Sequence, residues 1–225
     1  MSLSQAIAIF AKAPVPGRVK TRLHTCMTAA QSAELHAAFV ADTWERLASV
    51  SGVERYLYFD QPWNTFEKLA GPERFRLQQG GDLGSRMLTC MKELSALGHE
   101  RILVLGSDSP SLPIAYVEQA FFALDQTDTV LGPADDGGYY AVGCRRPDPG
   151  MFAGVTWSSP ETLQETASSF RACNLTVTLL DGWYDVDTEV ELARLAAEPL
   201  IPENTRRWFE SHPDIWARMG GSVIE

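Results

Sequence analysis

Short apolar runs alternate with longer amphipathic stretches along the chain. The run at 101–106 is almost continuously apolar, as expected for a strand inside a parallel sheet. Similar runs predict further strands, which lie at 5–12, 53–59, 75–78, 128–132, 139–143 and 175–180. Apolar residues at helical spacing predict the helices, which lie at about 28–50, 83–97, 113–125, 160–173, 188–197 and 203–218.

The repeated strand–helix units favour an α/β fold with a mostly parallel sheet, right-handed crossovers and helices on both faces. The neighbouring strands near 130 and 140 are where an antiparallel edge is expected to enter. We expect a single domain over 1–225, because the pattern shows no repeat or linker. Ligands of such sheets bind beyond the carboxyl ends of the strands, so the loops at those ends contain the candidate chemistry.

The composition, with 45% hydrophobic and 21% charged residues, is ordinary for a soluble globular protein. A net charge of −10 disfavours general nucleic-acid binding and attachment to anionic membranes. No apolar run approaches the roughly 20 residues that span a bilayer. The four cysteines form no C-x-x-C pair, which disfavours a zinc site or a disulfide framework. We therefore expect a cytoplasmic protein.

The loop at 11–23, after the first predicted strand, is a concentrated patch of cations. No Asp or Glu occurs before Glu34, and two prolines stiffen the loop. Gly17 can bring the backbone close to a ligand. A loop in this position typically binds phosphate, although a solvated basic connection is the alternative. The residues predicted to bind nucleotide phosphates here are Lys12, Gly17, Arg18, Lys20, Thr21 and Arg22. Lys20 and Arg22, nearest the helix start, are the first choices.

Two acidic segments follow predicted strands. Asp108 lies just after the strand at 101–106, at the carboxyl edge of the sheet, where a carboxylate can hold Mg²⁺ or Mn²⁺. Asp185 and Asp187 would point to the same side of an extended segment, and Asp187 precedes a helix. Helix capping is the competing explanation at both places. Together with the basic loop, two strand-end carboxylates favour a metal–nucleotide site with Asp108 and Asp187 as metal ligands.

Two glycine-rich segments are further candidates. Asp135 and Asp136 adjoin a glycine pair, so they are predicted to receive sugar hydroxyls or to act as a general base. The same segment is also a strong hairpin-turn signal. Gly81 opens a predicted helix and can accept a phosphate or nucleoside, with Arg86 as a possible anion partner. The four histidines show no ligand spacing.

Six segments taken in order resemble the DUF2064 family. This family is also called the rSAM/selenodomain-associated transferase 1 family, and it belongs with GT-A glycosyltransferases in the nucleotide-diphospho-sugar transferase superfamily. The likeness covers about 6–195, and a helical extension is expected at about 200–220. The segments are F-A-K-A-P-V-P-G-R-V-K-T-R-L, Q-G-G-D-L-G-S-R-M, L-G-S-D-S-P-S-L-P, G-P-A-D-D-G-G-Y-Y-A-V-G, V-T-W-S-S and Y-D-V-D-T.

The resemblance implies a three-layer α/β/α GT-A-like fold with a mostly parallel mixed sheet, a nucleotide-sugar site and a divalent cation. By position, Asp108 corresponds to the metal-binding acid, although a D-x-D pair is absent there. Asp187 resembles the second metal acid of related nucleotidyltransferases. The cations of the loop at 11–23 resemble a phosphate-contacting loop. Where the family commonly has Pro-Glu-Asp-Leu after Asp187-Thr188, this chain has Glu-Val-Glu-Leu at 189–192.

The leading hypothesis is sugar transfer from a nucleotide-diphosphate donor to an unknown acceptor. The cation and the basic loop would neutralise the diphosphate, and Asp135 or Asp136 would position the acceptor or remove a proton. One alternative is a nucleotidylyltransferase that uses a free nucleoside triphosphate and a phosphorylated substrate, since K-T-R-L is also similar to 2-phospholactate guanylyltransferases. The other alternative is a catalytically silent nucleotide-sensing module, which the missing D-x-D pair suggests.

Overall fold

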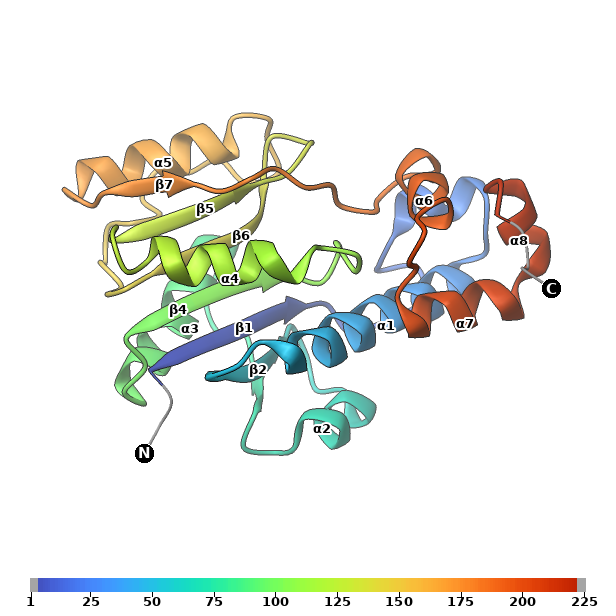
Figure 1. Ribbon diagram of the computed structural model, residues 1–225, viewed down its shortest axis with the longest axis horizontal. Helices are drawn as coiled ribbons and strands as arrows, with labels where there is room; N and C mark the ends of the chain where they lie inside the picture. Colours follow the sequence, from blue (N-terminus) through green and yellow to red (C-terminus); the bar gives the residue numbers. More distant parts are fainter. Residues whose placement is uncertain (1–3, 222–225) are drawn as a thin grey trace.

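The computed structural model describes residues 4–221, and its centre is one seven-stranded sheet (Figure 1). The strands lie in the order β3-β2-β1-β4-β6-β5-β7. Among them, β6 alone is antiparallel to its neighbours. The expected antiparallel strand is present, but it lies inside the sheet rather than at an edge. The strands are β1 (Gln5–Ala11), β2 (Val53–Phe59), β3 (Phe75–Leu77), β4 (Arg101–Gly106), β5 (Thr129–Pro133), β6 (Tyr139–Cys144) and β7 (Val177–Leu179).

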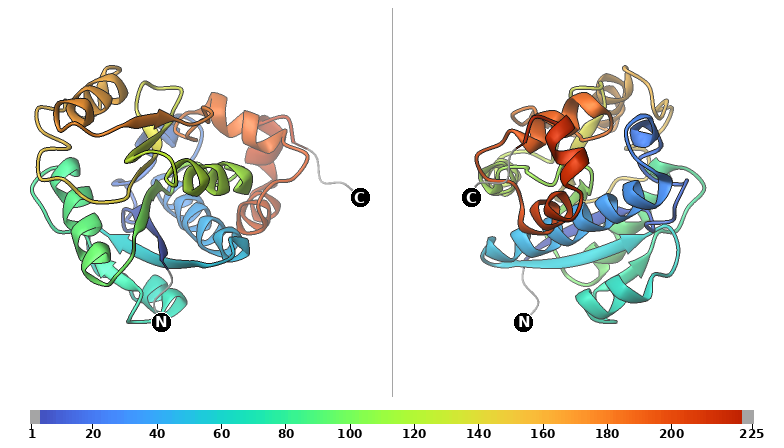
Figure 2. Two further views of the ribbon diagram at one scale, coloured as in Figure 1. Left: turned by 60° about the vertical axis from the view of Figure 1, so that its left-hand side comes forward. Right: turned by 90° about the vertical axis from the view of Figure 1, so that its right-hand side faces the viewer.

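Helices cover both faces of the sheet, and Figure 2 shows them on either side of the strands. Alternate residues of β1 belong to different cores: Ile7 and Ile9 pack with α1 and α4, whereas Ala6 and Ala8 pack with α3 and α5. The three-layer α/β/α arrangement is therefore confirmed. These helices are α1 (Ala29–Arg46), α3 (Leu83–Ala96), α4 (Ile114–Ala123) and α5 (Thr162–Ala172).

Side-chain caps fix where several helices begin. Thr28 and Gln31 form a reciprocal capping box at α1, and Asp82 and Ser85 form one at α3. Thr188 caps α6 (Glu189–Ala196) in the same way. Each cap pairs backbone N–H groups that the first helical turn leaves without partners.

Two features differ from the predicted elements. The helix expected at 203–218 is two helices, α7 (Glu203–Ser211) and α8 (Pro213–Arg218). Pro213 lacks the N–H needed inside a helix and instead occupies the first turn of a new one. The short helix α2 (Asn64–Ala70) was not predicted, because it buries only two of its residues and shows too little periodicity.

The last three helices gather beyond the carboxyl end of β1, beside α1 and the 3₁₀ turn η1 (Thr21–Thr25) (Figure 1). These helices share an apolar core with η1 and α1. The core includes Leu23 and Phe39 from the first half of the chain and Leu192 and Phe209 from the last helices. The extension expected at about 200–220 is thus helical and packed on α1. The termini of the expected domain, residues 1–3 and 222–225, lie outside the described residues.

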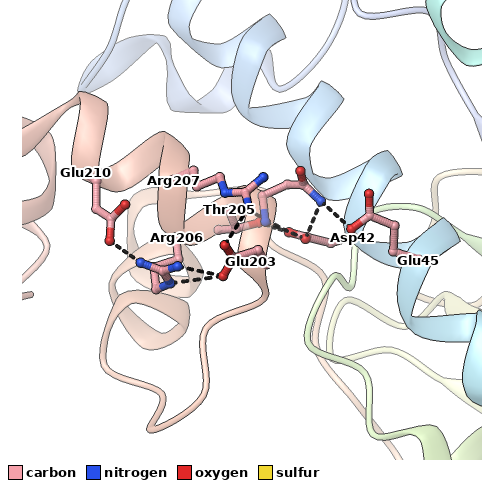
Figure 3. Close-up of polar contacts among 8 residues, drawn as sticks. Asp42, Glu45, Glu203, Thr205, Arg206, Arg207 and Glu210 are labelled. Carbon is pink, nitrogen blue, oxygen red and sulfur yellow. Dashed lines mark hydrogen bonds and ion pairs between the residues drawn. The ribbon is translucent and has the colours of Figure 1, made fainter. Parts of the chain in front are cut away.

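A buried carboxylate joins α1 to α7. Asp42 is 1% exposed and accepts hydrogen bonds from the backbone N–H groups of Asn204 and Thr205, at 2.7 and 2.8 Å (Figure 3). The Thr205 hydroxyl donates to it as well, at 2.6 Å. Asp42 therefore caps a helix to which it does not belong. Across residues 4–221, none of the helices is both long and apolar enough to cross a membrane.

Candidate functional site

A cleft of about 650 Å³ opens where β1 and β4 end. These two strands are neighbours, but the chain leaves β1 for β2 on one side and leaves β4 toward the other edge of the sheet. Such a switch in strand order leaves a crevice between diverging loops, and the volume suits a small ligand. The predicted residues that line this cleft are Lys12, Arg18, Lys20, Thr21, Arg22, Gly81, Arg86, Asp108 and Asp187.

Neighbouring elements hold the basic loop in place. The backbone N–H of Ala13 donates to the carboxylate of Asp60 after β2, at 2.7 Å. The Gln78 side chain donates to the carbonyl of Ala11 at 3.1 Å, and His36 on α1 donates to the carbonyl of Lys12 at 2.9 Å. These bonds fix the backbone of the loop, so a ligand meets a preformed surface.

The turn in the loop explains the role of its glycine. Gly17 has φ of +82°, a conformation that favours glycine. It is not among the residues that line the cleft, and its predicted contact with a ligand stays a prediction. Lys20 and Ser158 also have positive φ, at 47° and 59°, and both line the cleft. Sparsely populated backbone conformations of this kind cluster at functional sites.

The Lys20 ammonium lies between the two acids that were predicted to hold a metal. Its Nζ is 2.5 Å from Asp108 Oδ1 and 3.0 Å from Asp187 Oδ1. The Lys20 side chain is 3% exposed, and Nζ lies 5.4 Å from the centre of the Phe39 ring. Burial lowers the pKa of Lys20, but the two carboxylates outweigh burial and hold this pKa above its ordinary value. Lys20 is therefore charged.

One backbone hydrogen bond brings the two acidic segments together. The N–H of Val186 donates to the carbonyl of Asp108 at 2.8 Å, so the residues on either side of Val186 lie next to Asp108. Asp187 faces Lys20, and Asp185 accepts a hydrogen bond from the Ser109 hydroxyl. Burial and then the negative charge of Asp108 raise the pKa of Asp185 to about 7. The alternation of the two acids along the chain had already indicated that they share a side.

Helix capping was the competing explanation for Asp108 and Asp187, but neither residue is the N-cap of a helix. Pro113 is the N-cap residue of α4, so Asp108 does not cap that helix. Thr188 caps α6, which leaves the carboxylate of Asp187 available to the cleft. Asp82, next to Gly81, is the cap of α3. Burial raises the pKa of Asp108, but the neighbouring basic groups, with Lys20 first among them, together outweigh burial and hold this pKa below the usual value.

His36 is a site residue that the sequence did not reveal. It is 3% exposed, and its Nδ1 lies 3.7 Å from Asp108 Oδ1. Because Nε2 faces the carbonyl of Lys12, Nε2 holds the proton and Nδ1 has a free lone pair. Within residues 4–221, this Nδ1 has no hydrogen-bond partner. Burial lowers the pKa of His36, so the ring is neutral. A lone histidine on an apolar helix face shows no ligand spacing.

The turn at Asp135 and Asp136 lies apart from the residues that line the cleft. Both are exposed, and the turn itself is present as expected, because Asp136 accepts a hydrogen bond from Gly138 N at 2.8 Å. Asp135 pairs with Arg194 of α6 at 3.4 Å. The two acids follow β5, whose carboxyl end lies at the same edge of the sheet as that of β4. Their predicted catalytic role stays a prediction.

The predicted metal ligands have suitable chemistry, because Mg²⁺ and Mn²⁺ prefer oxygen donors. The carboxylates of Asp108 and Asp187 converge on a single point, as ligands of one cation do. That point is taken by the Lys20 ammonium. In the part of the chain that the structure describes, no group of three His, Cys, Asp or Glu side chains is arranged to hold a metal ion.

Comparison with known families identifies the chain. A family model described as "Uncharacterized protein conserved in bacteria (DUF2064)" matches residues 23–159, which is more than half of the sequence. The chain belongs to this family. The matched part includes Asp108 and the turn at Asp135, whereas the basic loop before Leu23 and the segment with Asp187 lie outside it. None of the curated proteins compared matches the chain.

Solved structures share the fold. A crystal structure described as a "putative nucleotide-diphospho-sugar transferase" from Desulfovibrio desulfuricans G20 is 31% identical, with a TM-score of 0.86 over 96% of this chain and 98% of that one. CMP:2-keto-3-deoxy-manno-octonic acid synthetase in complex with CTP has a TM-score of 0.55 at 14% identity, over 85% and 97%. The inositol-1-phosphate CTP transferase of T. maritima has a TM-score of 0.52 at 10% identity, over 99% of each chain. This DUF2064 protein therefore has the nucleotide-diphospho-sugar transferase fold.

Proposed function

We propose that this DUF2064 protein transfers a sugar from a nucleotide-diphosphate donor, bound in the cleft between β1 and β4, to an acceptor. One observation supports the proposal above the others. Cations of a preformed loop and a pair of carboxylates face the same crevice, where the fold places its ligands. A diphosphate between them meets positive charge on the loop side and can share a cation with the acids.

The cations have separate tasks in this proposal. Lys12, Arg18 and Arg22 are exposed at the cleft, so their charged ends are free to meet phosphate oxygens. Arg86, in the first turn of α3, also lines the cleft. Fixed positive groups near a departing nucleotide diphosphate stabilise its developing charge without reorganisation.

A divalent cation, Mg²⁺ or Mn²⁺, is also proposed, with Asp108 and Asp187 as the residues that would hold it. When bound, such an ion neutralises diphosphate charge and stabilises the leaving group. The acceptor side of the reaction is assigned to Asp135 and Asp136. Their exposure leaves them open to an acceptor that arrives from solvent rather than to the donor phosphates.

The test is a thermal-shift screen of nucleoside diphosphates, triphosphates and nucleotide-sugars of all common bases, with Mn²⁺ or with EDTA. At about 100 times its Kd, a ligand adds about 2.7 kcal/mol of stability, which raises Tm by several degrees in a chain of this size. A matching nucleotide-sugar should also release its nucleoside diphosphate during turnover. The proposal fails if no nucleotide-sugar binds or turns over across the panel.

Nucleotidylyl transfer is the second candidate, because two structures of this fold are a CMP-sugar-acid synthetase and a CTP transferase. Such a protein would consume a nucleoside triphosphate with a phosphorylated substrate. The released product separates the two reactions: pyrophosphate indicates nucleotidylyl transfer, and a nucleoside diphosphate indicates sugar transfer.

A further inference from the structure

The position of Lys20 is incompatible with a cation held by both acids. Two ligand atoms of one octahedral Mg²⁺ each lie about 2.1 Å from the ion. The ammonium nitrogen already lies 2.5 Å from Asp108 Oδ1 and 3.0 Å from Asp187 Oδ1. A divalent ion that touched both oxygens would overlap the ammonium or lie directly beside it. Repulsion between the two positive charges therefore prevents or weakens the binding of the metal ion while the Lys20 ammonium is in this place.

A second observation points to a cation at this place. The lone pair on His36 Nδ1 is buried and has no partner within residues 4–221, and it lies 3.7 Å from Asp108 Oδ1. Adjacent and opposite ligand atoms of one octahedral ion are about 3.0 and 4.2 Å apart, so the observed separation lies between the two and a shared cation would need a small movement of either side chain. An ammonium already paired with two carboxylates leaves the lone pair without a partner, whereas a metal ion can accept it.

We propose that Lys20 and a divalent cation compete for Asp108 and Asp187, and that the phosphates of a bound nucleotide decide the competition. The part played by the nucleotide rests on the function proposed above. Without nucleotide, the Lys20 ammonium keeps the acids paired. When a diphosphate enters the cleft, it offers Lys20 another anionic partner, and the acids become available to the metal.

The side chain of Lys20 is suited to such an exchange. Removing a buried ammonium from its carboxylates with no replacement leaves an unpaired charge, which is strongly unfavourable. Phosphate oxygens in the same cleft supply the replacement, because Lys20 lines the cleft beside Lys12 and Arg22. The four-carbon stem of lysine lets its point charge move between partners, which the rigid fork of arginine does less readily.

The direct test is the binding of Mn²⁺ alone, with free Mn²⁺ followed by electron paramagnetic resonance. Lys20→Met keeps an unbranched side chain of similar length and removes the charge that lies over the Phe39 ring. We expect this variant to bind Mn²⁺ at least about tenfold more tightly than the wild type, which is the worth of one charge-assisted hydrogen bond. The added substitution Asp187→Asn should abolish the gain and so locate the ion.

Lys12→Met is the matched control. It removes the same charge from the same loop, but Lys12 makes no ion pair with the acids among the described residues. Its Mn²⁺ affinity should stay within about twofold of the wild type, because an exposed charge is screened. The proposal is overturned if Lys20→Met does not tighten Mn²⁺ binding, or if Lys12→Met tightens it as much. Circular dichroism checks that each variant folds, and Lys20→Gln serves if Lys20→Met does not.

The nucleotide's part is tested by water proton relaxation enhancement, which distinguishes protein-bound from nucleotide-bound Mn²⁺. UDP, GDP and CDP are the probes. At least one should tighten Mn²⁺ binding by the wild type, and the same factor should appear in the nucleotide's affinity when Mn²⁺ is added. Lys20→Met should reduce this coupling. An equal coupling in both proteins overturns the nucleotide's part. If none of the three nucleotides and no nucleotide-sugar binds, the proposed function fails. The measurement with Mn²⁺ alone still tests whether Lys20 and the metal ion compete for Asp108 and Asp187.

Discussion

Asp42 and Asp108 are both carboxylates that pair with groups distant in the sequence, but their burial and their partners differ. Asp42 accepts hydrogen bonds only from uncharged groups of Asn204 and Thr205, in the first turn of α7 (Figure 3). Asp108 has a side chain that is 44% exposed, and its partner is the charged end of Lys20. The Asp42 carboxylate is covered by backbone and hydroxyl donors, whereas the Asp108 carboxylate shares one ammonium with Asp187.

The difference separates structure from function. The helix start of α7 needs a partner for its N–H groups, and its dipole favours a negative charge, so Asp42 is satisfied permanently. The Asp108 cluster leaves His36 Nδ1 without a partner within residues 4–221 and places a second acid, Asp187, on the same ammonium. This incomplete pairing in the cleft is the observation on which the proposed exchange of partners rests.

The largest expected effect is on turnover, through Asp108→Asn. Asparagine keeps the shape and removes the charge, so kcat/KM on the donor found in the screen should fall by about 10³-fold, or about 4 kcal/mol. Stability should change little, because the side chain is half exposed and Lys20 retains Asp187. Steady-state kinetics and Tm are the measurements. Turnover within tenfold of the wild type would exclude Asp108 from the reaction.

The next effect is on stability, through Asp42→Ala. This change leaves the N–H groups of Asn204 and Thr205 buried without an acceptor, so the free energy of unfolding should fall by about 3 kcal/mol. Urea denaturation measures the loss, and donor affinity at low temperature should be unchanged. Glu45→Ala is the control, because Glu45 makes one exposed bond to Asn204 and should cost less than about 0.5 kcal/mol. Equal losses in the two variants would remove the distinction.

A smaller effect is expected at the third carboxylate site, through Asp135→Asn. Asp135 pairs with Arg194, which is exposed and lies 3.4 Å away. This exposed ion pair differs both from the buried hydrogen bonds of Asp42 and from the pairing of Asp108 with a buried ammonium. If Asp135 assists the acceptor, turnover should fall by about 10–100-fold while the Kd of the donor stays constant, since the residue lies outside the cleft. A fall in donor affinity, or full activity, would contradict that role.

Much of the fold and part of the site followed from the sequence. The apolar run at 101–106 is a strand with the expected bounds, and the rule for parallel strand ends brought Asp108 beside the basic loop. The ion pair between Lys20 and Asp187 was not predicted, because it joins residues 167 positions apart through tertiary packing. His36 was missed because its burial, rather than its spacing, is informative.

The smallest effect extends the comparison to the surface, at Asp128. Its carboxylate accepts from the N–H and hydroxyl of Thr176, at 2.9 and 2.7 Å, which is the Asp42 arrangement without burial. Hydrogen bonds from Thr176 hold the pKa of Asp128 below its ordinary value of 3.8. The unfolded chain therefore binds a proton at higher pH than the folded one, so this stabilisation is present above about pH 4 and is lost as pH falls through the depressed pKa.

Asp128→Asn keeps an acceptor oxygen and removes only the charge. It should lower the free energy of unfolding by about 0.5 kcal/mol at pH 7, since an exposed charge is screened, and by less as the pH falls through the depressed pKa. Urea denaturation at pH 7 and at successively lower pH measures both. A loss as large as that of Asp42→Ala would mean that the donors alone, and not their burial, set the strength of these caps. A loss that does not shrink as the pH falls would show that the effect does not come from the carboxylate charge.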